Sequence, residues 1–203
     1  ETFLPEKSEA LADQDLVFVG RLVNNKGLLP IVDALKVLKE RNGEAPTLLI
    51  VGRGPMRNVL EQRLEAADLR SRVRFIDWVD GPEDLAEIYR RSRVLVCAST
   101  CEGGPRVTVE AMACGTPVIS TPVGVMTGLL EDGRAGKLCG FDAASIADGV
   151  DEVLSDEPAR RTMGEEAHAL AQSFEYAATL RGYATGLQRL AGEPEGLAGE
   201  TPE

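Results

Sequence analysis

The sequence predicts an α/β fold, a Rossmann-like doubly wound parallel sheet of about six strands with helices on both faces. Short apolar runs rich in β-branched residues recur along the chain as far as Thr121, and helical stretches lie between them. Such uninterrupted apolar runs are typical of parallel strands that are buried on both faces. Strands and helices that alternate in series build an open parallel sheet. After Gly124 the pattern becomes mainly helical, which predicts a helical carboxyl-terminal segment.

The individual elements follow from these runs. Strands are expected at 16–20, 47–52, 73–76, 94–98 and 117–121. The first helix, at about 27–41, is indicated by one apolar face that consists of Leu28, Ile31, Val32, Leu35 and Leu38. Further helices are expected at about 56–67, 83–91, 106–114, 143–154, 158–170 and 174–191.

The domain organisation is simple. Residues 1–14 are expected to be a linker, residues 15–191 one domain, and residues 192–203, GEPEGLAGETPE, a disordered tail. With 203 residues and 43% hydrophobic content, the chain can bury a sizeable core. No apolar run approaches the roughly 20 residues of a membrane span. The first residues also lack the basic and apolar regions of an export signal, so a cytoplasmic protein without a transmembrane segment is predicted.

The charge and the cysteines exclude several classes of function. A formal net charge of −11 argues against nucleic acid or an anionic membrane surface as the main partner, although adaptation to high salt is another explanation of the acidity. Any anionic ligand must therefore be held by local groups. The cysteines at 97, 101, 114 and 139 lack CxxC spacing, and buried reduced thiols are a better interpretation than a metal site or disulfides.

An open sheet of this kind binds ligands beyond the carboxyl ends of its strands. The stretch VGRLVNNKG places Gly20 and Arg21 just past the first strand and Lys26 at the start of the next helix. Two cations beside the free amides of a helix N-terminus favour a diphosphate, although this stretch taken alone is also explained by two solvated basic residues. The stretch VGRGP after the second strand lacks the GxGxxG spacing, so it predicts a close turn rather than a dinucleotide site.

The stretch CEGGPRVTVEAMACG carries two glutamates, Glu102 and Glu110. Pro105 fits the first position of a helix and the glycines before it allow close approach, so free amides from about 103 to 107 face an anion or a sugar hydroxyl. Glu102 lies at this turn, and Glu110 leans back toward it from the helix. A carboxylate suits vicinal hydroxyls such as those of ribose. The alternatives are compensation of the helix dipole for Glu102 and a solvated or paired surface residue for Glu110.

Together these stretches resemble the carboxyl-terminal, donor-binding domain of a family 4 retaining glycosyltransferase, one half of the GT-B architecture. The resemblance runs from about Leu16 to Leu154 through VGRLVNNKG, LLIVGRGPMRNVLE, VRFIDWV, DLAEIYRRSRVLVCAST, EGGPRVTVE, EAMACGTPVIST and LLEDGRAGKL. It implies transfer of a sugar from a nucleoside diphosphate sugar to an acceptor, with retained anomeric configuration and with neither a metal nor a cofactor. Other chemistries of this architecture, such as nucleotide-sugar epimerisation or glycan phosphorolysis, and a non-catalytic nucleotide-sugar-binding module are the alternatives.

The resemblance also implies roles for single residues. Arg21 and Lys26 would neutralise the donor diphosphate as the bond breaks. Glu102 would contact the donor sugar, so that these three residues form the catalytic set, and Glu110 would bind the ribose hydroxyls. The donor-binding set comprises Gly20, Arg21, Lys26, Glu102, Gly103, Gly104, Pro105, Arg106, Val107 and Glu110.

The chain departs from the family pattern GGxxE after the fifth strand, because Val125 follows Gly124 and Gly128 stands at the glutamate position. The resemblance implies an absent amino-terminal domain that holds a sugar, lipid or small-molecule acceptor and that could bring the enzyme to the inner face of the membrane. The chain alone is expected to turn over little or nothing. The single histidine, His168, falls in a predicted helix far from the strand ends, which favours a packing role.

Overall fold

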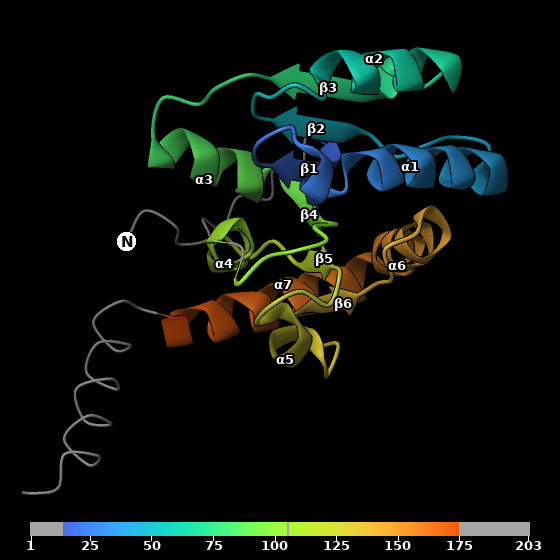
Figure 1. Cartoon of the computed structure of the whole chain (residues 1–203). Helices are drawn as coiled ribbons and strands as arrows, with labels where there is room; N and C mark the ends of the chain where they lie inside the picture. Colours follow the sequence, from blue (N-terminus) through green and yellow to red (C-terminus); the bar gives the residue numbers. More distant parts are fainter. Residues whose placement is uncertain (1–13, 105, 175–203) are drawn as a thin grey trace, which may run out of the picture.

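The structure, a computed structural model, describes residues 14–104 and 106–174. These residues form a parallel six-stranded sheet in the order β3-β2-β1-β4-β5-β6 (Figure 1). The strands are β1 (Gln14–Val19), β2 (Leu48–Val51), β3 (Val73–Ile76), β4 (Ser92–Cys97), β5 (Val118–Ser120) and β6 (Gly136–Leu138). The helices are α1 (Leu28–Asn42), α2 (Arg57–Ala66), α3 (Pro82–Arg90), α4 (Arg106–Ala113), α5 (Met126–Leu130), α6 (Ala143–Ser155) and α7 (Glu157–Ala171), and the 3-10 turns are η1 (Asn24–Lys26), η2 (Arg70–Arg72) and η3 (Gln172–Phe174). The predicted doubly wound parallel sheet is confirmed.

The strand order reverses between β1 and β4. From β1 the chain builds outward through β2 to β3, and it then returns to place β4 on the other side of β1. The register pairs Leu16 with Leu48 on one side of β1 and with Val94 on the other. Where the connections from two adjacent strands lead in opposite directions across a sheet, the helices that follow these strands leave a crevice beyond their carboxyl ends. The loops after β1 and β4 therefore meet at this switch point.

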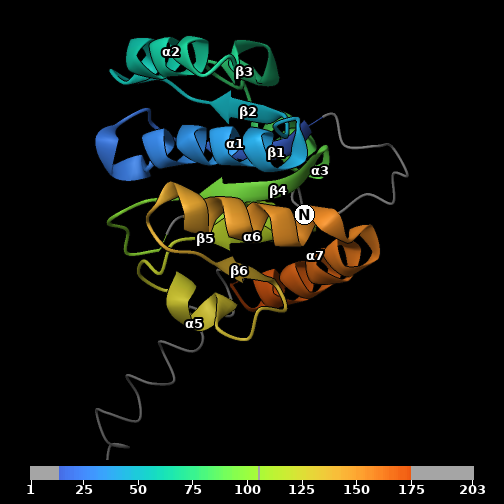
Figure 2. The ribbon, with the colours of Figure 1, turned by 90° about the vertical axis from the view of Figure 1, so that its right-hand side faces the viewer.

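Two helical layers cover the sheet (Figure 2). In one apolar cluster Leu16 and Phe18 pack with residues of α1, α2 and α6, and in the other Val17 and Leu95 pack with residues of α3, α4 and α7. Successive side chains of a strand point to opposite faces, so a strand between two layers must be apolar throughout. Burial of each such side chain contributes about 1.5–3 kcal/mol.

The chain beyond β5 differs from the sequence prediction. Helix α5 and strand β6 lie between the predicted strand at 117–121 and the predicted helix at 143–154, in a segment for which the sequence predicts neither a helix nor a located strand. Strand β6 has three residues, Gly136, Lys137 and Leu138, at the edge of the sheet, so it lacks the apolar run that marks a buried strand. At the other end, β1 begins at Gln14, inside the predicted linker. The rest of that linker, the predicted tail and all but the first residue of the helix predicted at 174–191 lie outside the described residues.

Three of the four thiols are buried, as the sequence predicts. Cys97, Cys114 and Cys139 are buried and free, and burial raises the pKa of Cys114 and of Cys139 to about 12, so both stay protonated and unreactive. The prediction is wrong for Cys101, which is exposed, because it stands in the turn after β4 rather than in the strand. Within the described residues no helix is long and apolar enough to span a bilayer.

Candidate functional site

The loops after β1 and β4 are bound together at the switch point. The backbone amide of Thr100 donates to the carbonyl of Asn25 at 2.9 Å. Gly27, between η1 and α1, has φ +68°, and a Cβ built on it would lie 1.9 Å from the carbonyl oxygen of Ala98. Only glycine fits both the left-handed conformation and this contact. The start of α1 is thereby pressed against the loop that follows β4.

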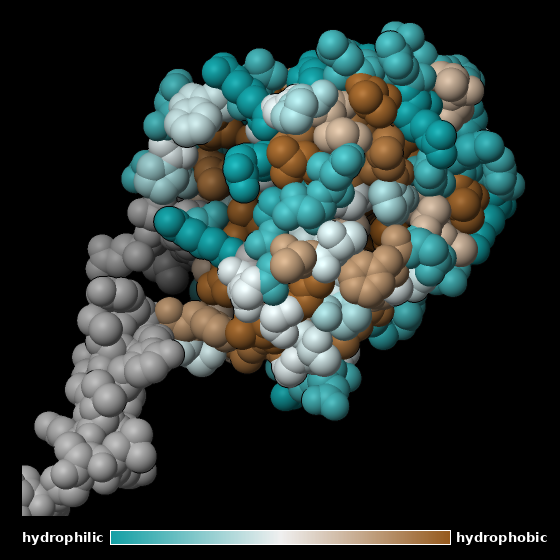
Figure 3. All heavy atoms as spheres, in the orientation of Figure 1, coloured by the Kyte–Doolittle hydropathy of each residue, from teal (hydrophilic) through white to brown (hydrophobic). Residues whose placement is uncertain are grey.

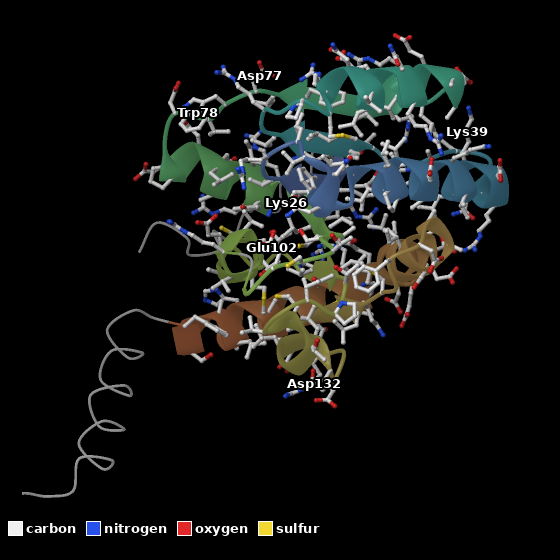
Figure 4. All side chains as sticks on the ribbon, viewed as in Figure 1. Lys26, Lys39, Asp77, Trp78, Glu102 and Asp132 are labelled. Atoms are coloured by element: carbon white, nitrogen blue, oxygen red, sulfur yellow. The ribbon has the colours of Figure 1, made fainter. Side chains whose placement is uncertain are left out.

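This contact brings two predicted site residues together. The Lys26 ammonium forms an ion pair with Glu102 Oε1, and their side chains are only 20% and 19% exposed. The hydroxyl of Ser99 donates to the same oxygen at 3.3 Å. Figure 4 shows the two labelled side chains close together, from the loops after β1 and β4. A cation and a carboxylate thus lie side by side at the switch point of the sheet.

The loop after β5 supports the turn that carries Glu102. Gly124 has φ +51°, and a Cβ on it would lie 2.1 Å from the carbonyl oxygen of Gly103. The amide of Val125 donates to that same carbonyl at 3.2 Å, and a Cβ on Gly104 would touch the Val125 side chain at 3.3 Å. The segment in which the sequence departs from the family pattern therefore shapes the Glu102–Gly104 turn. The predicted site residue Pro105 lies outside the described residues.

Glu110 lies in α4 with both carboxylate oxygens engaged. Arg106 Nε approaches Oε1 at 2.7 Å, and the Tyr89 hydroxyl donates to Oε2 at 3.3 Å. The Glu110 side chain is 13% exposed and the Arg106 side chain is 87% exposed. Burial is the main cause that raises the pKa of Tyr89 well above its ordinary value, and the negative charge of Glu110 is the second. The hydroxyl therefore keeps its proton and stays a donor.

Three further predicted residues, Gly20, Arg21 and Val107, differ in how close they lie to the Lys26–Glu102 pair and in how deeply they are buried. Gly20 lies beside Lys26, since a Cβ on Gly20 would stand 4.0 Å from Lys26 Cε. Arg21 is exposed and forms no ion pair within the described part of the chain. Val107 packs against the core beneath α4, so its side chain supports the helix. The structure therefore joins Lys26 to Glu102, and Arg106 to Glu110, but it does not join Arg21 to any of them.

Sequence reasoning missed Ser99, Tyr89, Gly27 and the supporting contact of Gly124. Tyr89 falls on the apolar face of the helix predicted at 83–91, where an aromatic residue indicates core packing. Nothing local shows that its hydroxyl reaches a carboxylate on the next helix. For Ser99 a weak signal existed, because a hydroxyl three positions before Glu102 is close enough to bond it.

The loop after β3 forms the outer border of the same edge. Asp77 is held by Arg53 at 3.5 Å and by Arg57 at 3.1 Å, and the neighbouring Trp78 is 70% exposed (Figure 4). Trp78 is the one tryptophan of the chain. Its fluorescence is a natural reporter on this edge of the sheet.

A cavity of about 470 Å³ lies elsewhere, near the amino ends of β2 and β3, and four arginines line it: Arg57, Arg70, Arg72 and Arg74. Arg57 is paired with Glu61 at 2.8 Å and Arg72 with Glu44 at 2.6 Å, so much of this positive charge is already neutralised. We therefore assign the candidate site to the carboxyl edge, where the predicted residues gather.

His168 belongs to α7 and packs against the end of α4, in accord with the predicted packing role. Its Nδ1 lies 2.8 Å from the carbonyl oxygen of Ala113, at the carboxyl end of α4. Within the described residues no group of three or more His, Cys, Asp or Glu side chains is placed to hold a metal ion.

The six-stranded parallel sheet and the solved structures on which it superposes define the class, a Rossmann-like domain of the GT-B glycosyltransferase architecture. Sucrose-phosphate synthase from Thermosynechococcus elongatus superposes with a TM-score of 0.79 at 28% identity, over 94% of this chain and 51% of that one. Anabaena Alr3699/HepE in complex with UDP superposes with a TM-score of 0.75 at 26% identity, over 87% of this chain and 49% of that one.

The sequence itself places the chain more narrowly. The model of the family glycosyl transferases group 1 matches residues 1–169, and the chain belongs to this family. A D-inositol 3-phosphate glycosyltransferase of Corynebacterium urealyticum is 34% identical over 167 residues, which are 78% of this chain and 39% of that protein. The chain thus spans well under half the length of this relative.

Proposed function

We propose that this chain is the donor-binding domain of a retaining glycosyltransferase and that it binds a nucleoside diphosphate sugar at the carboxyl edge of its sheet. The observation that carries the proposal is the ion pair of Lys26 with Glu102 at the switch point between β1 and β4. The similar Alr3699/HepE structure holds UDP, which supports a nucleotide ligand for this fold. The D-inositol 3-phosphate glycosyltransferase that resembles this chain supports sugar transfer.

The donor diphosphate would compete with Glu102 for Lys26. In the structure the ammonium is held by a carboxylate of opposite charge. A diphosphate offers more negative charge, and this charge grows as the sugar leaves, so Lys26 would stabilise the departing group most when the bond breaks. Arg21, which is exposed and has no ion pair within the described residues, is available to swing onto the same phosphates. With two cations present, we propose that binding needs no metal.

The two glutamates would bind the two sugars of the donor. Once Lys26 turns to the phosphates, Glu102 is released to accept from hydroxyls of the transferred sugar. Backbone amides of Gly103 and Gly104, at the head of α4, would lie along the phosphates and the sugar. Glu110 would accept from the ribose hydroxyls after Arg106, which is exposed, moves aside. Transfer with retained configuration, which we propose, would then require the acceptor to attack the face of the sugar from which the nucleoside diphosphate departs.

The acceptor would be held by a second, amino-terminal domain, and the chain alone would turn over little. The matched relative is more than twice as long as the stretch that it shares with this chain. Exposed apolar side chains, Val125 at 46% and Phe141 at 47%, follow β5 and β6. Figure 3, in the view of Figure 1, shows hydrophobic residues at the surface over the lower centre of the molecule and mainly hydrophilic residues along its upper edge. The four free cysteines accord with a reducing compartment, so we propose a cytoplasmic enzyme.

Titration calorimetry with UDP, GDP, ADP, the matching nucleosides and the common sugar conjugates tests the proposal. We expect one base to be preferred, and we expect Lys26→Ala to weaken the diphosphate by about tenfold or more while the nucleoside changes little. Lys36→Ala is the matched control, because Lys36 lies on the exposed face of α1 in a loose 3.7 Å pair with Glu40. An equal loss for nucleoside and diphosphate, or no binding at millimolar concentration, would contradict the proposal.

A further inference from the structure

Tyr89 contacts the candidate site from the buried core of the domain. It belongs to α3, its side chain is fully buried, and its hydroxyl donates to Glu110 Oε2 on α4 at 3.3 Å. The other oxygen of the carboxylate, Oε1, faces Arg106 at 2.7 Å. One oxygen of Glu110 is thus bound from the core and the other from the surface.

The two partners of Glu110 differ in how firmly they are held. The Tyr89 ring packs in the apolar cluster beneath α4, and its main-chain carbonyl accepts a hydrogen bond from the Thr116 hydroxyl at 2.7 Å. In contrast, the Arg106 side chain is 87% exposed, and a guanidinium so open to solvent gains little from its ion pair and exchanges it readily. A ligand can therefore displace Arg106 from Oε1, whereas the bond to Oε2 stays in place.

We propose that Tyr89 is a positioning residue, which fixes the Glu110 carboxylate so that it reads the ribose diol and selects ribonucleoside over 2′-deoxyribonucleoside diphosphate donors. The inference rests on the proposed function and extends it to the class of donor. With Oε2 held, Oε1 points in one direction and accepts from a ribose hydroxyl once Arg106 leaves. A 2′-deoxy donor keeps its 3′-hydroxyl but lacks the 2′-hydroxyl, so Oε1 would lose that hydrogen bond in a half-buried position, which is costly.

A purely structural role for the Tyr89 hydroxyl makes a different prediction. A buried hydroxyl needs an acceptor, and Glu110 supplies one. If this were its whole role, removing the hydroxyl would change stability but would leave the preference for ribose over deoxyribose untouched. The ratio of the two affinities therefore separates the two roles.

The experiment uses Tyr89→Phe, which removes only the hydroxyl. The affinities of the best-bound nucleoside diphosphate and of its 2′-deoxy form are measured by calorimetry, with Trp78 fluorescence as a second readout. We expect the wild-type chain to prefer the ribonucleotide by about tenfold. In Tyr89→Phe most of this preference should disappear through weaker binding of the ribonucleotide, while the affinity for the deoxy form is nearly unchanged.

Thr116→Val is the matched control, because it removes another buried hydrogen bond of Tyr89 and leaves Glu110 untouched. It should lower stability and keep the ratio. Glu110→Gln should lower the ratio by itself, and adding Tyr89→Phe to it should change the ratio little further. An unchanged ratio in folded Tyr89→Phe, or equal binding of both sugars by the wild-type chain, overturns this inference alone. Absence of all nucleotide binding overturns the proposed function, and this inference with it.

Discussion

Lys26 and Glu102 form an ion pair across the switch point of the sheet, although 76 positions separate them in the sequence. Each is carried by a short loop whose position depends on a glycine. Gly27 lets the loop that carries Lys26 contact Ala98. Gly124 lets the loop after β5 contact Gly103, in the turn that carries Glu102. The charge pair is therefore set by close approaches of backbone to backbone.

Replacement of Glu102 by Gln should separate the binding of the phosphates from the binding of the sugar. Without the carboxylate, Lys26 has no competitor for the diphosphate, so we expect the free nucleoside diphosphate to bind as well as before or more tightly. The sugar loses a charged acceptor, so the added affinity of the sugar conjugate should fall by about tenfold. Calorimetry with both ligands gives the two effects, and Glu40→Gln, in an exposed pair on α1, is the control. Equal weakening of both ligands would contradict the assignment.

Gly27→Ala and Gly43→Ala form a matched pair for stability. Both glycines have positive φ, +68° and +82°, but an added Cβ meets Ala98 at Gly27 and nothing within 4 Å at Gly43. We expect Gly43→Ala to lower the free energy of unfolding by about 1 kcal/mol from backbone strain alone, and Gly27→Ala by more than about 2 kcal/mol. Urea denaturation measures both. Similar losses would mean that the α1 loop relaxes away from Ala98 without cost.

The fold was largely predictable because its signal is local. The five apolar positions of the first predicted helix, from Leu28 to Leu38, are all buried on α1, since their spacing matches a helical turn. Strand β6 could not be located, because Gly136, Lys137 and Leu138 are too few and too polar to indicate a buried strand. An edge strand forms because it pairs with its neighbour, here β5. The residues of the edge strand alone therefore do not indicate it.

The candidate site was predictable only in part, because some of its contacts depend on packing between elements that lie far apart in the sequence. Lys26 and Glu102 each stand in a recognisable turn after a strand, so parallel topology alone brings their loops to one edge. The hydrogen bond from Tyr89 to Glu110 depends on how α3 packs against α4. The spacing of the two residues in the sequence does not indicate this bond. Gly124 lies in a segment where the family pattern fails, and only its contact with Gly103 shows that it has a role.

The Asp15 carboxylate should make stability depend on pH. Burial raises the pKa of Asp15, but the amide and hydroxyl of Thr47, at 2.9 Å each, and Arg93, at 3.0 Å, outweigh it, so the pKa lies below 3.8. A lowered pKa means that the native state holds fewer protons than the unfolded state. The stabilisation is complete above about pH 3.8 and is lost as the pH falls through the lower native pKa.

We therefore expect Asp15→Asn to lower the free energy of unfolding by about 1 kcal/mol at pH 7 and by less in strong acid. Denaturation in urea at pH 7 and below pH 3 compares the two conditions. Asp148→Asn, which affects an exposed pair with Arg41, is the control and should change little at either pH. An identical loss at both pH values would show that the charge of Asp15 is not what stabilises this end of the sheet.

Gly124→Ala should damage donor binding from outside the two glutamate-bearing segments. Its φ is +51°, and an added Cβ would lie 2.1 Å from the carbonyl oxygen of Gly103 and 2.5 Å from that of Glu102, so the turn must move. Gly133→Ala is the control, because its φ is also positive, +69°, but the nearest atom is the Lys137 ammonium nitrogen at 3.7 Å, an ordinary van der Waals contact. Both variants should lose some stability from backbone strain.

Only Gly124→Ala should also weaken the nucleotide sugar, by about tenfold, because the displaced turn misaligns Glu102 and the amides beside it. Calorimetry well below the unfolding temperature of either variant separates this loss of affinity from the loss of stability. Unchanged donor affinity in folded Gly124→Ala would mean that the Glu102–Gly104 turn takes its shape from its own residues, and that the loop after β5 merely accommodates it.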